Sequence, residues 1–436
     1  MFKAASLFLF FGLALGSCKT SDSPQANSET LASSRSLIVP LTEVAATPFD
    51  FCPEKRAINL KNNMWLSFLS ANQYSHWGVV GPMLEKLGFG DKGEGDAYLK
   101  AWWELRIKRI QEGRPDTDDA WGTPQERVKL ENAALASYQS LFGKPFVSDG
   151  IDSIKTQENL VGGKKPEAKI QFISGLSAET GTIEKTSTQV LYAEHSKINL
   201  SVVSFRGTEG EEGPDRVADL KLTQVKFDGF GFVHAGFYEA YQQVDAQLLK
   251  TLRTRSAAKP MNLWITGHSL GAALSTIFTA RVMDLQAKGD LPNVRLVGTY
   301  NVGSPRVFDV TGSTKFDELI VKNKVNFVRF RNHKDLVTGI PTGIPGAPAS
   351  YWHVGALGYY NATGKLFYGD GWASIEKDSD ILTSLPTEVG DHDVAKYFKF
   401  AKGAIAASTD AVAKGCAPAA TDKPLAPFRE NPKSRT

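Results

Sequence analysis

Two kinds of hydrophobic pattern divide most of the chain. Between residues 51 and 165, apolar residues recur at helical spacing, as at Met64, Trp65, Phe68 and Leu69. Between residues 166 and 400, short apolar runs rich in strand formers alternate with helical stretches. Such alternation predicts a mostly parallel sheet with helices on both faces. We therefore expect an N-terminal helical extension at 51–165, followed by an α/β domain at 166–400.

Three helices are expected in the extension. The first should end at the Gly81–Pro82 pair, because proline cannot continue the helical hydrogen bonds. The second should begin near Asp96 as its N-cap, and the third has Pro124 at its first position and stops at Gly143. A lipid-binding stripe is one reading of the Trp102–Trp103 pair. Apolar residues at helical spacing are more often core, and we expect core here.

The α/β domain has strand-like and helical runs in regular succession. Because parallel sheets place their sites at the carboxyl ends of the strands, candidate chemistry is sought there. The expected strands are 170–173, 189–192, 200–205, 264–266, 296–301 and 325–330, and the expected helices lie near 238–252, 270–285 and 315–321.

One strand and one helix meet at Ser269. The junction reads Gly267-His268-Ser269-Leu270-Gly271, which is the G-x-S-x-G pattern of a nucleophile elbow. A serine on such a sharp turn is strained and crowds its neighbours, so the positions two residues away must lack a Cβ. We predict Ser269 as a nucleophile. The backbone N–H of Leu270, at the helix N-terminus, is expected to stabilise an oxyanion.

A serine nucleophile needs an acid and a base, which follow it in that order on this kind of sheet. Asp335 comes directly after the strand at 325–330 and is the predicted acid. Asp309 is the alternative, but it is expected to cap a turn.

Two histidines follow Asp335 at a suitable distance. His353 lies after a Gly/Pro-rich loop, which could carry a base to the edge of the sheet. His392 lies between Asp391 and Asp393 and resembles a solvated residue in the first turn of a helix capped by these aspartates. We therefore predict His353 as the base.

The second donor of an oxyanion hole should come from another loop that follows a strand. Residues 201–205 form such a strand and lead into Arg206-Gly207-Thr208. Thr208 is the predicted donor, through its N–H and hydroxyl. The alternative is that these three residues form only a turn.

Six segments together carry a resemblance to the class 3 (fungal-type) lipases of the α/β-hydrolase superfamily. The resemblance covers about residues 189–355 and implies an α/β-hydrolase fold, with Ser269, Asp335 and His353 as the triad and Thr208 and Leu270 as the oxyanion hole. It gives His234 a structural role. The segments are Phe205-Arg206-Gly207-Thr208, Val233-His234-Ala235-Gly236-Phe237, Thr266-Gly267-His268-Ser269-Leu270-Gly271, Gly303-Ser304-Pro305-Arg306-Val307, Asp335-Leu336-Val337 and Tyr351-Trp352-His353-Val354-Gly355.

The segment after Thr208 departs from the lipase pattern. Lipases of this family carry an amphipathic lid helix there, whereas residues 209–220 are acidic, with two glycines and a proline. The feruloyl esterases, which are similar relatives, also have polar lids. We expect a serine ester hydrolase of acyl lipids, with an esterase of soluble esters as the alternative. An inactive envelope binding protein is disfavoured, because no triad residue is missing.

The N-terminus has the pattern of an export signal. Lys3 precedes an apolar run at 4–15, and Leu15-Gly16-Ser17-Cys18 resembles a bacterial lipobox. We expect a signal peptide at 1–18, lipidation of Cys18 and a flexible tether at 19–50. This predicts a membrane-anchored protein of the bacterial cell envelope, at the outer membrane or in the periplasm, with cleavage and release as the alternative.

Composition excludes some partners. The formal charge of +3 is too small and too dispersed for nucleic-acid binding, and no His/Cys/Asp cluster has metal-ligand spacing, so we expect no cofactor. Cys52 and Cys416 are expected either to form a disulfide or to remain buried thiols. Residues 401–436 are expected to form a short helix and a disordered basic tail.

Overall fold

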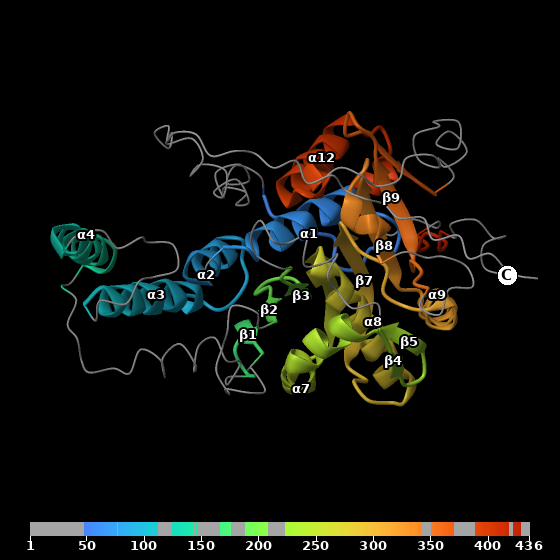
Figure 1. The fold of residues 1–436 in the computed structure, drawn as a ribbon, viewed down its shortest axis with the longest axis horizontal. Coiled ribbons are helices and arrows are strands. Elements are labelled where there is room, and N and C mark those ends of the chain that lie inside the picture. Colours follow the sequence, from blue (N-terminus) through green and yellow to red (C-terminus); the bar gives the residue numbers. More distant parts are fainter. Residues whose placement is uncertain are drawn as a thin grey trace, which may run out of the picture. The chain divides into compact units, whose positions relative to one another are not determined.

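An eight-stranded sheet forms the centre of the computed structural model (Figure 1). The strands from β3 to β9 run parallel, whereas β1, β2 and β10 are antiparallel to their neighbours. The sheet order is β1 (Ile170–Ser174), β2 (Gln189–Glu194), β3 (Ser201–Phe205), β6 (Met261–His268), β7 (Val294–Val302), β8 (Asn326–Asn332), β9 (Ala356–Tyr360) and β10 (Leu366–Tyr368). The structure describes residues 48–75, 77–111, 124–143, 145, 166–175, 188–207, 223–341, 350–369, 389–417 and 422–428.

Both faces of the sheet are covered. β6 is buried at all of its positions, and successive side chains enter different cores: Trp264 lies in one hydrophobic cluster, Leu263 and Ile265 in the other. α7 (Ala235–Ala258) and α8 (Leu270–Ala287) contribute to the second cluster, and α1 (Leu60–Asn72) and α12 (Val394–Ala407) to the first. The expected α/β fold, mostly parallel and with helices on both faces, is confirmed.

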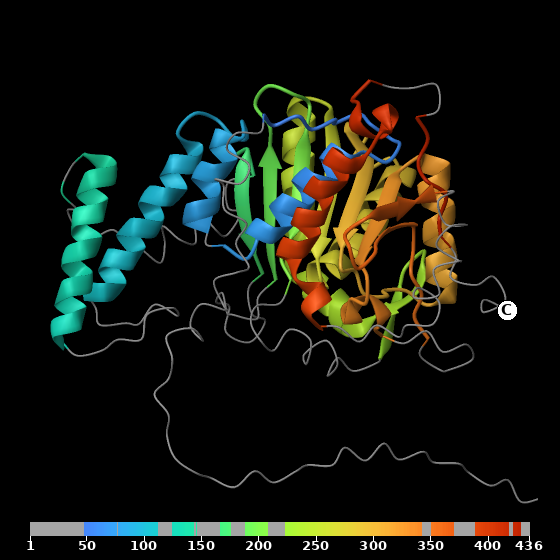
Figure 2. The ribbon, with the colours of Figure 1, turned by 90° about the horizontal axis from the view of Figure 1, so that it is seen from above.

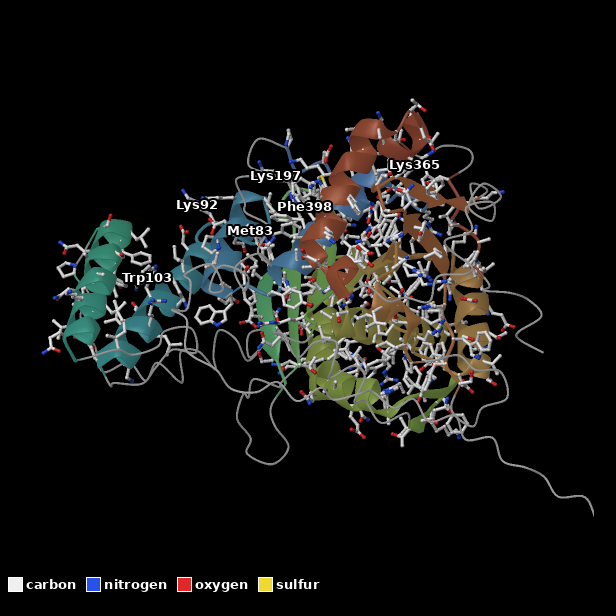
Figure 3. The ribbon with its side chains drawn as sticks, turned by 45° about the horizontal axis from the view of Figure 1, so that its top comes forward. Met83, Lys92, Trp103, Lys197, Lys365 and Phe398 are labelled. Atoms are coloured by element: carbon white, nitrogen blue, oxygen red, sulfur yellow. A yellow bond between two sulfur atoms is a disulfide. The ribbon has the colours of Figure 1, made fainter. Side chains whose placement is uncertain are left out.

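α1 and α12 lie side by side on one face of the sheet (Figure 2). Phe398, which Figure 3 labels on α12, packs against Phe68 of α1 with ring centroids 5.7 Å apart. Ser70 on α1 hydrogen-bonds Thr266 of β6 at 2.8 Å. The first helix of the expected N-terminal extension therefore packs on one face of the sheet and shares its hydrophobic core.

α2 (Trp77–Lys86) corrects one prediction, because Pro82 lies inside it and the Gly81–Pro82 pair does not end a helix. The reason is tertiary packing. α3 (Glu94–Gln111) crosses α2 so closely that a Cβ at Gly78 would lie 2.3 Å from Trp102 Cβ. The contact between the helices outweighs the hydrogen bond that proline cannot make.

The remaining helices of this region agree more closely with the pattern. α4 (Pro124–Phe142) begins at Pro124 and ends before Gly143, whose φ is 68°. Asp96 lies in the first turn of α3 and is not its cap. Trp102 packs against the main core, and Trp103 packs against the smaller cluster that α3 and α4 share, which agrees with the expected core role.

The C-terminal region also differs from its prediction. α12 continues to Ala407, α13 (Ala411–Lys414) follows, and described residues beyond 401 contact the domain. The N–H of Phe428 donates to the carbonyl of Gly355 at 2.9 Å. Cys416 forms a disulfide with Cys52, the first of the two alternatives expected for this pair. Within the described residues, this region is therefore not a disordered tail.

Smaller elements complete the described part of the fold. Of the described helices, none is long and apolar enough to cross a membrane. Residues 1–47, including Cys18 and most of the expected tether, lie outside the described residues. The smaller elements are β4 (Gln224–Phe227), β5 (Gly231–His234), α9 (Val310–Asn323), η3 (Leu336–Gly339) and η5 (Val389–His392).

Candidate active site

Ser269 lies on the turn between β6 and α8, in the backbone conformation expected of a nucleophile elbow. Its φ of 59° and ψ of −128° are strained for a residue with a side chain. A Cβ at Gly267 would lie 2.2 Å from the carbonyl oxygen of Gly271, and one at Gly271 would lie 2.3 Å from that of Phe205. Both glycines are therefore required by close backbone contacts. The local prediction for the elbow agrees with this geometry.

Asp335 follows β8 and is fully buried. Its Oδ1 and Oδ2 lie 2.9 and 3.0 Å from His392 Nδ1. The Tyr397 hydroxyl donates to Oδ2 at 2.5 Å, and the N–H of Val337 donates to Oδ1 at 2.9 Å. Burial alone would raise the pKa of the Asp335 carboxyl, but His392 and these hydrogen bonds outweigh it and hold that pKa below its usual value.

The pairing with Asp335 determines which nitrogen of His392 can act as a base. A neutral imidazole that donates its Nδ1 proton to a carboxylate keeps a lone pair on Nε2. Nε2 of His392 is buried and has no hydrogen-bond partner among the described residues. The ring stacks on that of His268, the residue before Ser269, with centroids 4.4 Å apart. A basic nitrogen is thus available next to the elbow.

His353 does not pair with Asp335, which corrects the prediction for the base. Its Nε2 lies 2.8 Å from the carbonyl oxygen of Thr338 and donates to it. Because Thr338 is in the 3₁₀ helix η3 that follows Asp335, His353 supports the backbone behind the acid. A nitrogen that donates to a carbonyl has no lone pair with which to accept a proton.

The sequence contained the signal for His392, but local reasoning assigned it to another role. Asp393 does cap α12, accepting from the N–H of Ala395 at 2.9 Å, and Asp391 contacts His333. Only Asp393 is therefore a cap, and His392 beside it is only 12% exposed and is not solvated. The pairing across 57 residues depends on α12 packing beside α1, which no local pattern reveals.

Of the two expected oxyanion donors, Leu270 lies within the described residues. Leu270 is the first residue of α8, where backbone N–H groups have no partner within the helix. Thr208 lies outside the described residues. Gly207, immediately before it, is described, and a Cβ placed there would lie 3.3 Å from Ser269 Cβ. The chain that leads to Thr208 therefore passes beside the serine.

Two further sequence candidates have structural roles. Asp309, the alternative acid, caps α9 by accepting from the N–H of Gly312 at 2.7 Å. His234 is fully buried and its Nδ1 accepts from the N–H of Phe237 at the start of α7. Burial lowers the pKa of His234 to about 4. Across the described ranges, no group of three or more His, Cys, Asp or Glu residues could hold a metal ion.

Comparisons with known proteins find similarity to lipases. Residues 202–344 match the model of the family "Lipase (class 3)". Phospholipase A1-II 3 of Oryza sativa subsp. japonica is 32% identical over 177 residues, covering 34% of this chain and 39% of the relative. Triacylglycerol lipase OBL1 of Ricinus communis is 25% identical over 211 residues, covering 38% of each. The chain thus spans about two fifths of the length of these curated relatives.

Solved lipase structures are also similar. A triacylglyceride lipase of Rhizomucor miehei has 22% sequence identity and a TM-score of 0.38, covering 62% of this chain and 94% of the lipase. A mutant of MDLA from Penicillium cyclopium has 24% identity and a TM-score of 0.37, covering 50% of this chain and 77% of MDLA. The strand, elbow and helix around Ser269, set in a mostly parallel sheet, are those of an α/β-hydrolase. The family match spans residues 202–344, which include the elbow and Asp335.

Proposed function

We propose that this protein is a serine ester hydrolase that acts through Ser269, His392 and Asp335. The observation that carries the proposal is the Asp335–His392 pair next to the nucleophile elbow. Nδ1 of His392 contacts the carboxylate, and Nε2 has no hydrogen-bond partner among the described residues. The His392 ring stacks on His268, which precedes Ser269. Nucleophile, base and orienting acid are the minimum set for acyl transfer by serine.

The chemistry of the proposed reaction follows from the protonation of His392. Nε2 takes the proton of the Ser269 hydroxyl as Oγ attacks the ester carbonyl carbon, which forms a tetrahedral oxyanion. The Leu270 N–H and Thr208 stabilise this oxyanion. The C–O bond to the alcohol then breaks, and the alcohol leaves with the proton from Nε2. Water, deprotonated by the same nitrogen, attacks the acyl-enzyme and releases the acid.

The proposed substrates are acylglycerols or phospholipids. Two similar proteins are named phospholipase A1 and triacylglycerol lipase, and both classes of substrate present a fatty acyl ester to the serine. The acidic composition of residues 209–220 favours a second candidate, an esterase of soluble esters. That segment lies outside the described residues.

Hydrolysis of p-nitrophenyl butyrate and palmitate by the wild type and Ser269→Ala tests the proposal. We expect the variant to lose activity by a factor of about 10⁴. A lipase should also show a jump in rate once the substrate exceeds its solubility limit, whereas an esterase of soluble esters should not. Equal, low activity of both proteins on both esters would leave an inactive binding protein as the better interpretation.

We also propose that the protein is exported and anchored through a lipid on Cys18, where it would meet its substrate at a membrane of the cell envelope. The apolar run at 4–15 and the sequence Leu15-Gly16-Ser17-Cys18 support this proposal. Radiolabelled palmitate should be incorporated by the full chain and not by Cys18→Ala in a bacterial host. Label in both proteins, or in neither, would contradict anchoring at this cysteine.

A further inference from the structure

His268, the residue before the nucleophile, has both of its ring nitrogens engaged. Nδ1 lies 2.7 Å from the Tyr74 hydroxyl, and Nε2 lies 2.8 Å from the main-chain carbonyl oxygen of His392. The residue is 5% exposed. The reaction described above uses neither contact, although the second one joins the elbow directly to the backbone of the proposed base.

These contacts determine the tautomer of His268. A carbonyl oxygen can only accept, so Nε2 must carry the proton and donate to His392. In the neutral ring Nδ1 then has a lone pair, and the Tyr74 hydroxyl donates to it. Burial first, and then the neighbouring His392, lower the pKa of His268 to about 3, so the ring is neutral at ordinary pH.

The Tyr74 hydroxyl makes a second contact, with the loop that leads to Thr208. The Tyr74 hydroxyl lies against the Gly207 backbone, since a Cβ at Gly207 would lie 2.2 Å from that oxygen. The Arg206 guanidinium lies over the tyrosine ring, 6.0 Å from its centroid. One phenol group therefore contacts the Gly207 backbone and the elbow, and through His268 it is connected to the segment that carries the base.

We infer that Tyr74 and His268 are positioning residues that hold three separate parts of the active site in register. The Tyr74 hydroxyl lies against the Gly207 backbone and donates to His268 Nδ1, and His268 Nε2 donates to the His392 carbonyl. Tyr74 follows α1, outside the segment 202–344 that matches the lipase family. The N-terminal helical region thus contributes to the geometry of the base.

The inference rests on the proposed function, and it predicts a particular kinetic change. Removing the hydroxyl leaves His268 free to adopt the other tautomer, which cannot donate to the His392 carbonyl. The backbone of His392 then loses its hydrogen bond to the elbow residue His268. Neither hydrogen bond of His268 involves the substrate, so substrate binding should change little. Small displacements of this kind reduce catalysis by about 10- to 100-fold. Tyr74→Phe should therefore lower kcat by that factor and leave KM near the wild-type value.

Tyr98→Phe is the matched control. Its buried hydroxyl also makes a hydrogen bond, donating to the Ile170 carbonyl at 2.8 Å, and Tyr98 lies on α3 beside the edge strand β1. We expect both variants to lose similar thermal stability, but only Tyr74→Phe to lose kcat. Equal kcat values in the two variants would overturn the inference.

A pair of substitutions at His268 tests the donor itself. Glutamine can still present an N–H toward the His392 carbonyl, whereas leucine fills similar space without a donor, so His268→Gln should retain a kcat at least about tenfold above His268→Leu. Equal kcat values in two folded variants would contradict the positioning role. Full ester hydrolysis by Ser269→Ala would instead refute the proposed function, which separates the two failures.

Discussion

At the residue scale, two histidines near Asp335 present different atoms to the site. His392 directs Nδ1 to the carboxylate and keeps Nε2 available, whereas Nε2 of His353 donates to the Thr338 carbonyl. His353 is 4% exposed and the His392 side chain 12% exposed, and each follows Asp335 in sequence, so exposure and order alone do not distinguish their roles. The hydrogen-bond partner of each Nε2 distinguishes the two histidines, because only a nitrogen with a lone pair accepts a proton.

Alanine at each histidine should separate these roles. His392→Ala is expected to lower kcat/KM by a factor of about 10⁴, because the serine loses its base. His353→Ala should lower the melting temperature through the lost bond to Thr338, with less than about a tenfold effect on kcat/KM. Ester hydrolysis and thermal unfolding of both variants provide the test. A larger activity loss in folded His353→Ala than in His392→Ala would restore His353 as the base.

At the scale of elements, the elbow depends on how closely α8 approaches β3. Gly271 is in the first turn of α8, where a Cβ would lie 2.3 Å from the Phe205 carbonyl oxygen and 2.8 Å from the Arg206 carbonyl carbon. These are backbone atoms at the end of β3, and they cannot move without moving the strand. The same close packing places the helix N-terminus beside the loop that precedes Thr208.

Gly271→Ala should consequently destabilise the fold and lower activity. We expect a loss of about 1–3 kcal/mol in the free energy of unfolding, typical of overpacking, with reduced kcat/KM. Gly403→Ala is the control, since Gly403 is an exposed position within α12 with no atom within 4 Å of its Cβ site. Alanine there should stabilise the protein by about 0.5–1 kcal/mol. Urea unfolding measures both changes. A change of the same sign in the free energy of unfolding of the two variants would contradict this account.

At the scale of the whole molecule, the two ends of the described chain are joined. Cys52 and Cys416 form a disulfide across 364 positions, and Lys55 donates to the carbonyl of Ala417 at 2.9 Å. The Asp422 carboxylate accepts from the N–H of Ala57 at 2.7 Å. The N-terminal segment before α1 and the C-terminal segment after α13 therefore support each other, and the first leads directly into α1, which Tyr74 follows.

Breaking the disulfide should weaken this arrangement. A cross-link over so long a loop restricts the unfolded chain strongly, so Cys52→Ser/Cys416→Ser is expected to lower the free energy of unfolding by about 2–5 kcal/mol. Urea unfolding with and without a thiol reductant measures it. The reductant should bring the wild type to the level of the double variant and leave the variant unchanged. A wild type indifferent to reduction would show that the bond contributes nothing.

Stability should also fall in mild acid. Burial lowers the pKa of His268 to about 3 and that of His234 to about 4, whereas in the unfolded chain both take a proton near about 6.5. Between these values the unfolded state binds more protons, so their contribution is complete above about 6.5 and declines as the pH falls toward the folded pKa values. Urea unfolding at about pH 7.5 and 5 should show the loss, and His268→Gln should reduce it. Equal stability at both pH values would contradict the prediction.

Local rules were sufficient for features whose cause lies within a few residues. The alternation of strands and helices, the elbow at Ser269, the start of α4 at Pro124 and the cap at Asp309 all depend on hydrophobic period, backbone strain or capping. Asp335 is likewise predicted as the acid from its position directly after the strand β8. These features could be read from the chain because their energies are set by near neighbours.

Tertiary packing decided the rest. Pro82 remains inside α2 because α3 packs against its glycine face, and His392 reaches Asp335 because α12 lies against α1 on the sheet. The contact of Tyr74 with His268 likewise joins residues 194 positions apart. Burial and hydrogen bonding between distant segments outweigh local propensity at these sites, so the base and the residues that position it became evident only in the folded chain.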